Sequence, residues 1–191
     1  MQKTVRLSEI AVIQSGYSFR GAVVNVEGGK LGVIQAKDIN GWQVYEPGLS
    51  SINQEHSSGR LQQDGDILLT SRGSFRAGVG RFSRPAIASS SLFTIRLLSK
   101  DFLPEYLAIY LNSEAAQYYF SQSAKGATIQ SLVVDDLKNL PIPHMPLENQ
   151  KTVIDLQRNI DEQNGLLKRK QRIIDEVLRS SIMRTIEGAT K

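Results

Sequence analysis

The chain has 191 residues, of which 40% are hydrophobic and 22% are charged, and its formal net charge is +4. This length supports one core, or one core plus an extended element, and the composition excludes an intrinsically disordered chain. The absence of cysteine excludes disulfides and thiolate metal sites and fits a reducing cytoplasm, and no stretch approaches the ~18 apolar residues of a membrane span. We therefore expect a soluble, cytoplasmic protein with one folded unit.

Short elements typical of an α+β fold occupy the first part of the chain. Apolar periodicity and turn residues predict a short helix at residues 6–13, and they predict strands at residues 30–39, 66–71, 78–82 and 91–98. Residues 104–122 begin with a proline and carry apolar residues at helical spacing, so they predict one amphipathic helix packed against the sheet. The expected architecture is a mixed β-sheet with small helices.

The composition changes near Pro146. Residues 147–187 contain a single glycine, no proline and many Glu, Lys, Arg, Leu and Ile residues. The preceding Pro-Ile-Pro-His-Met-Pro stretch is expected to be a stiff, extended link, and proline fits the first turn of a helix. We therefore predict one domain at residues 1–146 and a long C-terminal coiled-coil helix at residues 147–191.

A heptad pattern in the second part predicts a partner helix. The residues that we expect in the interface between helices are Val153, Leu156, Ile160, Leu167, Ile174 and Leu178, with Val177 widening the stripe. Gln157, Asn164 and Gln171 dilute one edge, so a helix folded back on its own domain is the alternative. A helix of roughly 60 Å would favour an arm or spacer, unless Gly165 interrupts it.

Residues 67–100 form a local basic segment. They contain no acidic residue, and their basic residues are Arg72, Arg76, Arg81, Arg84, Arg96 and Lys100. The planar fork of arginine suits phosphate oxygens and the guanine edge, and Ser71 and Ser74 can add neutral phosphate contacts. Any one of these arginines fits a solvated surface equally well, but as a group they favour nucleic acid as a partner.

Enzyme motifs are weak in this sequence. Asp135, Asp136 and Lys138 have the Asp-x-Lys arrangement of metal-dependent nucleases, but the same residues fit a short helix capped by Ser131 with acids in its first turn. Residues 73–80 lack the Gly-Lys-Ser/Thr of a phosphate loop and predict a tight turn between strands. The only histidines, His56 and His144, are isolated in sequence. We expect no catalysis, no metal and no cofactor.

Four stretches, in order, resemble the specificity subunit of type I restriction-modification systems. They are LSEIAVIQSG (residues 7–16), GDILLTSRGS (65–74), PEYLAIYLNS (104–113) and GATIQSLVVDDLKNLPIPHMPLENQKTVI (126–154). Family members of usual length carry two tandem units, each a target recognition domain followed by a long helix. This sequence contains one unit and therefore resembles a half-length form, with the family's Leu-x-Glu-Gln present as Leu147-Glu148-Asn149-Gln150.

The resemblance implies a non-catalytic reader of double-stranded DNA. It implies that methyltransferase subunits dock on the chain, with a restriction/translocase subunit joining through them, and that two helices pair antiparallel. A homodimer would then recognise a palindromic site split by a non-specific gap. The residues that we expect at the DNA are Arg20, Lys37, Ser71, Arg72, Ser74, Arg76, Arg81, Lys125 and Thr128.

Two other functions compete with this interpretation. The chain could be an adaptor or decoy that occupies methyltransferase subunits through its helix without reading DNA. It could also be a small nuclease that uses Asp136 and Lys138.

Overall fold

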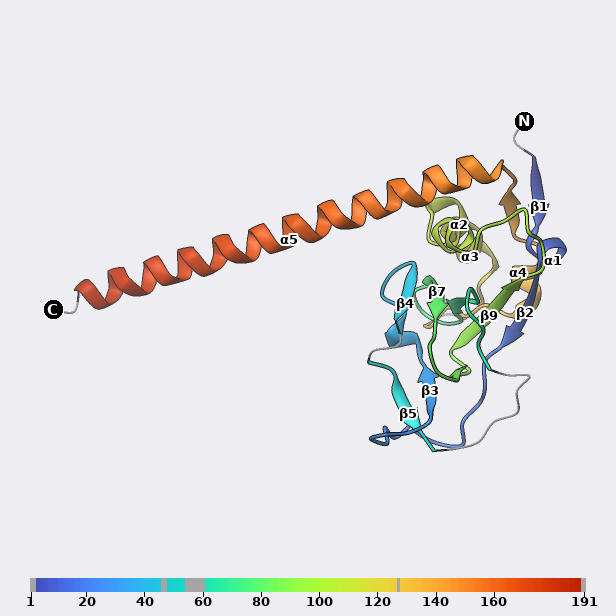
Figure 1. The fold of residues 1–191 in the computed structure, drawn as a ribbon, viewed down its shortest axis with the longest axis horizontal. Helices are drawn as coiled ribbons and strands as arrows, with labels where there is room; N and C mark the ends of the chain where they lie inside the picture. Colours follow the sequence, from blue (N-terminus) through green and yellow to red (C-terminus); the bar gives the residue numbers. More distant parts are fainter. Residues whose placement is uncertain (1–2, 46–47, 54–60, 127, 190–191) are drawn as a thin grey trace. The chain divides into compact units, whose positions relative to one another are not determined.

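The protein is described here by a computed structural model covering residues 3–45, 48–53, 61–126 and 128–189. The chain divides into two compact units, Met1–Lys151 and Thr152–Lys191. The first unit combines three β-sheets with short helices, and a long helix begins near its end (Figure 1). The expected α+β class, with a mixed sheet, small helices and a long C-terminal helix, is confirmed.

Three sheets form the framework of the first unit. The largest has the strand order β2 (Ala11–Ser15), β9 (Leu92–Leu97), β6 (Ile67–Thr70), β7 (Ala77–Arg81), β4 (Gln43–Tyr45). Its pairs are antiparallel, except that β4 and β7 run parallel. The second sheet has the order β5 (Ser50–Ile52), β3 (Leu31–Ile34), β8 (Ala86–Ala88), and the third pairs β1 (Thr4–Arg6) with β10 (Pro141–Pro143).

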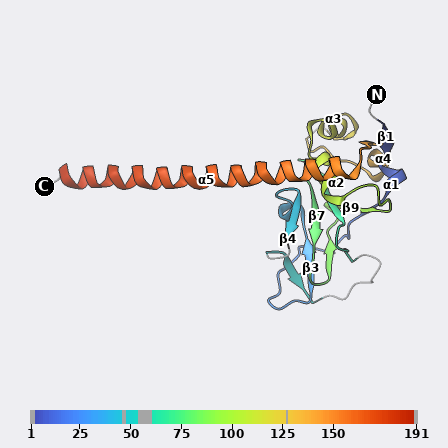
Figure 2. The same cartoon turned by 45° about the horizontal axis from the view of Figure 1, so that its top comes forward.

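Helices cover the edges and one end of this framework. Helices α2 (Pro104–Leu111) and α3 (Glu114–Ser123) lie at the opposite end of the unit from β3 and β5 (Figures 1 and 2). Helices α1 (Leu7–Ile10) and α4 (Val134–Lys138) contact each other and β2. A 3-10 turn, η1 (Ala36–Asp38), follows β3, and helix α5 spans Leu147–Ala189.

The main core lies between the five-stranded and three-stranded sheets. Ile34 and Ala88 from the smaller sheet pack with Leu68, Leu92 and Val44 from the larger one, and all five are buried. Burial of such aliphatic side chains is the main favourable term in folding. Strand β6 is buried along its whole length, which explains why its sequence, ILLT, begins with three consecutive apolar residues instead of an alternating pattern.

Tertiary contacts alter several of the predicted elements. The predicted helix at 6–13 is wrong in its second half, because residues from Ala11 onward pair with β9. The predicted strand at 30–39 ends at Ile34, and a 3-10 turn follows in which Asp38 Oδ2 accepts the Gln35 amide at 2.8 Å. The strands expected at 66–71, 78–82 and 91–98 are confirmed to within one residue at each end.

The single helix predicted at 104–122 is two helices, α2 and α3. Asn112 lies between them, and its side chain accepts the Ala77 amide at 2.9 Å and donates to the Ala77 carbonyl at 2.8 Å. The hydroxyl of Ser113 then caps α3 by accepting the Ala116 amide at 3.4 Å. The Asn112 side chain, which lies at the break between α2 and α3, therefore attaches these two helices to strand β7.

The first turn of α5 is fastened to the first unit by a buried glutamine, Gln150. Its Oε1 accepts the Leu103 amide at 2.8 Å, and its Nε2 donates to the carbonyls of Asp101 at 2.7 Å and Met145 at 2.9 Å. The side-chain amide thereby satisfies three backbone groups. The helix begins at Leu147, directly after Pro146, as the sequence predicts.

Two tyrosines of α2 hold β10, the segment that the sequence predicted only as a stiff link. The hydroxyls of Tyr106 and Tyr110 donate to the carbonyls of Pro143 at 2.8 Å and Pro141 at 2.7 Å. Burial raises the pKa of Tyr106 to about 12 and also raises the pKa of Tyr110.

Replacing Tyr106 with phenylalanine is expected to lower the free energy of unfolding by about 1 kcal/mol, because one hydrogen bond is lost. The folded-state pKa of Tyr106 lies above the unfolded value of about 10, so the contribution of the protonated phenol is complete below that pH and is lost as the pH rises through about 12. Urea unfolding and spectrophotometric tyrosine titration measure both effects. Tyr118→Phe, at an exposed position, is the control, and an equal loss of stability there would contradict the prediction.

The second unit is the continuation of α5, which runs without a break through Gly165. Its apolar side chains at 156, 160, 166, 167, 173, 174, 177 and 178 are all exposed. Short-range pairs such as Arg158 with Asp155, at 3.0 Å, occur along the helix surface. No helix in the described part of the chain is both long enough and apolar enough to cross a membrane.

Candidate nucleic-acid interface

Separate loops of the first unit surround an open hollow of about 690 Å³, here called the Arg72 hollow. It lies beyond the C-terminal end of β2, between the β6–β7 loop, the turn before β9 and the segment leading into α4. Its lining consists of Ser15, Ser71, Arg72, Ser90, Phe93, Ile129, Ser131, Leu132, Val133, Val134 and Asp135.

Backbone hydrogen bonds hold the β6–β7 loop, residues 71–76, against its neighbours. The Ser71 amide donates to the Ser91 carbonyl at 2.9 Å, and the Ser71 carbonyl accepts the Leu132 amide at 3.0 Å. Within the loop, the Thr70 hydroxyl donates to the Ser74 carbonyl at 2.6 Å and accepts the Arg76 amide at 2.8 Å. The loop that carries Arg72 is thus fixed from both sides.

Backbone hydrogen bonds also hold the described residues of the segment before α4, residues 125–126 and 128–131. Lys125 and Ser131 exchange amide–carbonyl bonds of 3.0 and 2.8 Å, and the Gly73 amide donates to the Gln130 carbonyl at 2.9 Å. Gly126 has a φ of +119°, and a Cβ there would lie 2.3 Å from the Ile129 carbonyl oxygen, so this turn requires glycine. The exposed side chains of Lys125 and Thr128 are carried beside the Arg72 loop.

Arg72 is exposed, and its guanidinium has no hydrogen bond or ion pair with any residue that the structure describes. Among the described residues that line the same hollow, Asp135 alone carries a carboxylate, and this carboxylate binds Lys138 Nζ at 2.7 Å. That hydrogen bond, with the charge of Lys138, lowers the pKa of Asp135. Because Asp135 is already paired with a cation, Arg72 remains available to an external anion or acceptor.

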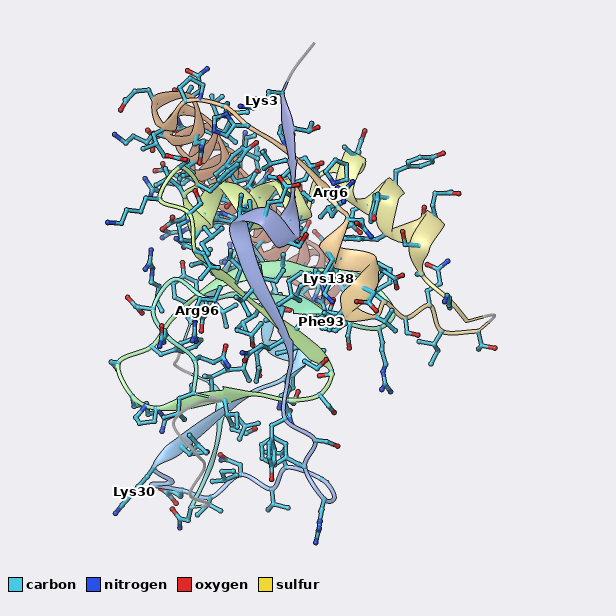
Figure 3. All side chains as sticks on the ribbon, turned by 90° about the vertical axis from the view of Figure 1, so that its right-hand side faces the viewer. Lys3, Arg6, Lys30, Phe93, Arg96 and Lys138 are labelled. Atoms are coloured by element: carbon cyan, nitrogen blue, oxygen red, sulfur yellow. The ribbon has the colours of Figure 1, made fainter. Side chains whose placement is uncertain are left out.

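The other arginines of the basic segment have partners inside the protein. Arg96 forms two bonds to the buried Asp66 carboxylate, at 2.7 and 2.6 Å, which raise its pKa. Arg81 pairs with Asp64 at 3.4 Å and with Glu105 at 2.5 Å. Figure 3 shows Arg96 on one side of β2 and Phe93, from the opposite face of β9, on the side of α4 and Lys138. The segment is therefore not one continuous basic surface.

Two further arginines bind backbone carbonyls. Arg84 Nη1 donates to the Gly29 carbonyl at 3.2 Å. Arg76 Nη2 donates to the Ala36 carbonyl at 3.2 Å, which places Arg76 beside the 3-10 turn that carries the exposed Lys37.

The structure brings some of the expected DNA-binding residues together and leaves others apart. Ser71, Arg72 and Ser74 share the β6–β7 loop, and Lys125 and Thr128 occupy the loop bonded to it. Arg76 and Lys37 are neighbours through η1, outside the lining of the hollow. Arg20 and Arg81 also lie outside that lining, and Arg81 has its charge compensated by two carboxylates.

The Asp-x-Lys triplet forms a helix cap. Asp136 Oδ2 accepts the Val133 amide at 2.8 Å, so α4 is capped from within. The prediction that Ser131 caps this helix is wrong, because the Ser131 hydroxyl donates to the Lys125 carbonyl at 3.3 Å. Across the described ranges, no three His, Asp or Glu residues gather as a candidate metal site. His144 makes an edge contact with Phe102, and His56 lies outside the described residues.

The glycine-rich run at 73–80 is a turn only in its first part. Gly73 has a φ of +72° in the loop, whereas Gly78 and Gly80 lie within strand β7. A Cβ at Gly78 would lie 2.7 Å from the Gly41 carbonyl oxygen, so this strand glycine permits close approach of a neighbouring segment. The predicted tight turn is therefore confirmed for residues 73–76 and wrong for residues 77–80.

Sequence reasoning missed the uncharged lining of the hollow, above all Ser90, Phe93, Ile129 and Val133. These residues come from separate segments, and none carries a charge or motif that marks a site. The glycine at 126 was the one available signal, since it indicates a constrained turn next to Thr128.

The fold is shared with specificity subunits of type I restriction-modification systems. The HsdS subunit from Thermoanaerobacter tengcongensis is similar, with a TM-score of 0.64 and 23% identity over 88% of this chain and 39% of its own. A chain from a structure on complex assembly and conformational transition of the type I R-M system has a TM-score of 0.65 and 24% sequence identity. The match covers 88% of the present chain and 40% of that chain. The type I restriction-modification S subunit from M. genitalium has a TM-score of 0.58 and 17% sequence identity, and the match covers 85% of the present chain and 39% of that chain. The present chain thus spans about two fifths of the length of these proteins.

The sequence matches the family model described as the type I restriction modification DNA specificity domain over residues 2–176. The chain therefore belongs to this family, with a single target recognition domain, and the resemblance inferred from its four motifs is confirmed. A comparison with curated protein sequences gave no match.

Proposed function

We propose that this chain recognises one half of a split double-stranded DNA site, as the specificity subunit of a type I restriction-modification system. The observation that supports this most directly is Arg72, which is exposed, has no partner in the described chain and stands on a loop fixed by backbone hydrogen bonds. Because the backbone of this loop is already held in place, binding orders only the arginine side chain, and its two parallel donors match O6 and N7 of guanine in the major groove.

The residues around Arg72 suit two kinds of DNA contact, to base edges and to phosphates. Ser71, Ser90 and Ser131 line the same hollow. The hydroxyls of Ser71 and Ser131 donate to the carbonyls of Ser90 and Lys125, which leaves their oxygens as acceptors, and the Ser90 hydroxyl can donate to or accept from base edges or phosphates. The exposed Lys125 and Thr128, together with Ser74, suit phosphate contacts, and the Arg76–Lys37 pair extends the basic surface. Arg81 and Arg20 are retained as outer phosphate contacts, with Arg81 the weaker because of its two carboxylate partners.

We further propose that two copies pair through α5, antiparallel, to form a homodimer. The seam between helices is supplied by the half-buried Val153 and by an exposed stripe of Leu156, Ile160, Leu167, Ile174 and Leu178. Such a pair has two-fold symmetry, so its two recognition domains would read a palindromic site with a gap. In this division residues 1–146 recognise DNA and residues 147–191 pair and space the copies.

In this proposal the chain is non-catalytic and acts in the cytoplasm without a cofactor of its own. Methyltransferase subunits dock on it and supply modification, and a restriction/translocase subunit joins through them. The family to which the chain belongs supports this assignment.

A second candidate is an adaptor or decoy that binds methyltransferase subunits through α5 without reading DNA. The observation in its favour is that the apolar stripe of the second unit is exposed in its own right. A gel-shift assay with and without methyltransferase subunits separates the two, since a decoy shifts no DNA in either mixture.

The test of DNA recognition is selection of binding sites from random duplexes, followed by measurement of affinity at increasing salt. We expect a split, palindromic consensus and an affinity that falls about hundredfold or more between roughly 50 and 200 mM salt, because several phosphate contacts release counterions. An asymmetric consensus would contradict the homodimer, and salt-insensitive binding would contradict the phosphate contacts.

The same duplexes incubated with Mg²⁺ test the nuclease alternative. We expect intact DNA. Cleavage that requires Mg²⁺ and is abolished by Asp136→Ala would replace the proposed function with catalysis at α4.

A further inference from the structure

Ile129 stands at the lip of the Arg72 hollow with 64% of its surface exposed. It lies in the segment at residues 128–131, between Thr128 and Gln130. Exposure alone says little, because single apolar residues are common on protein surfaces. Leu98, for example, is 67% exposed.

The surroundings of Ile129 distinguish it from Leu98. Its loop is closed by the bonds between Lys125 and Ser131 and is joined to the Arg72 loop by the Gly73–Gln130 bond of 2.9 Å. Gly126 lies directly under the Ile129 carbonyl, which fixes the turn that carries the side chain. The backbone that carries the apolar side chain of Ile129 is therefore held in place beside an available arginine.

The apolar character continues into the hollow. Val133, which is half-exposed, and the buried Leu132 and Phe93 line it together with Ile129. The hollow thus presents a cation, serine hydroxyls and an apolar wall side by side. Among the groups of the DNA major groove, the guanine edge complements an arginine, and the thymine 5-methyl group complements an apolar side chain.

We propose that Ile129 is a specificity-determining residue that contacts the 5-methyl group of a thymine in the recognised half-site. This inference rests on the proposed DNA-recognition function and adds a named base feature to it. The thymine would lie near the base pair contacted by Arg72, because the two side chains border the same hollow.

The test replaces each thymine of the selected half-site, one at a time, with deoxyuridine, which removes only the methyl group. For the wild-type chain we expect one position at which this substitution weakens binding about fourfold, the effect of one buried methyl. The Ile129→Ala variant should bind the thymine site about four- to tenfold more weakly. At that one position it should no longer distinguish thymine from deoxyuridine.

Leu98→Ala is the matched control, since Leu98 is equally exposed but follows the far end of β9, roughly 16 Å along the strand from Phe93. It should bind and discriminate as the wild type does, and thermal unfolding should show both variants folded. If no sequence-selective binding is found at all, the proposed function fails. If selective binding is found but the half-site lacks thymine, or Ile129→Ala still discriminates at every position, this inference alone is overturned.

Discussion

Leu167→Asp is expected to convert a dimer into single chains, with the dissociation constant rising hundredfold or more. Leu167 lies in the proposed seam of α5 and is 62% exposed in the single chain, so its burial depends on a partner. Burying one leucine contributes about 1.5–3 kcal/mol, and two-fold symmetry counts the loss twice. A buried aspartate adds a desolvation cost. Sedimentation equilibrium over a range of protein concentrations measures the effect.

The neighbouring leucine supplies the control for this variant. Leu166 is similarly exposed, but it lies about 100° around the helix from Leu167 and outside the proposed seam. Leu166→Asp introduces the same charge next to the same position and should dissociate the dimer much less. Equal dissociation by both variants, or a wild-type chain that is single at every concentration, would contradict the proposed seam.

Arg72→Ala should weaken binding to the selected DNA site tenfold to hundredfold. If its guanidinium forms the two-donor contact to guanine, substitution also relaxes the preference at that base pair by about 1–3 kcal/mol. Fluorescence anisotropy with the consensus duplex and with each single-base variant measures affinity and preference together.

Lys100→Ala is the control for net charge, because it removes the same unit of positive charge from an exposed position beyond the far end of β9. It should lower affinity slightly and uniformly across sequences. If both variants weaken every duplex to the same extent, Arg72 contributes only to the general field and is not a base-reading residue.

Local pattern predicted strands β6, β7 and β9 and the long helix, but it missed the three-residue strands and assigned the start of strand β2 to a helix. Strands β6, β7 and β9 were found because each carries several apolar residues bounded by turns. Strands β4, β5, β8 and β10 have only three residues each, which is too short for an alternating pattern to stand out. The break between α2 and α3 depends on the contact of Asn112 with Ala77, which no local pattern contains.

The basic residues of the candidate site could be predicted from the sequence, but the number of arginines free to bind an external partner could not. Residues 67–100 contain no acid, yet Arg81 and Arg96 are paired with acids outside that window: Asp64, Asp66 and Glu105. Strand pairing brings Asp64 and Asp66 close to these arginines, and the packing of α2 on β7 does the same for Glu105, so a count along the sequence overstates the free positive charge. Arg72 has no carboxylate partner among the described residues, because its loop packs on the backbone of residues 130–132.

The way in which Gln150 attaches α5 places few demands on the side chains around it. All three partners of Gln150 are main-chain atoms, of Asp101, Leu103 and Met145, which any residue except proline at the donor position would supply. Substitutions at those three positions, and among the exposed loops around the Arg72 hollow, leave this anchor intact. The loops around the Arg72 hollow are thus free to change in sequence without loss of the three hydrogen bonds by which Gln150 holds the first turn of α5.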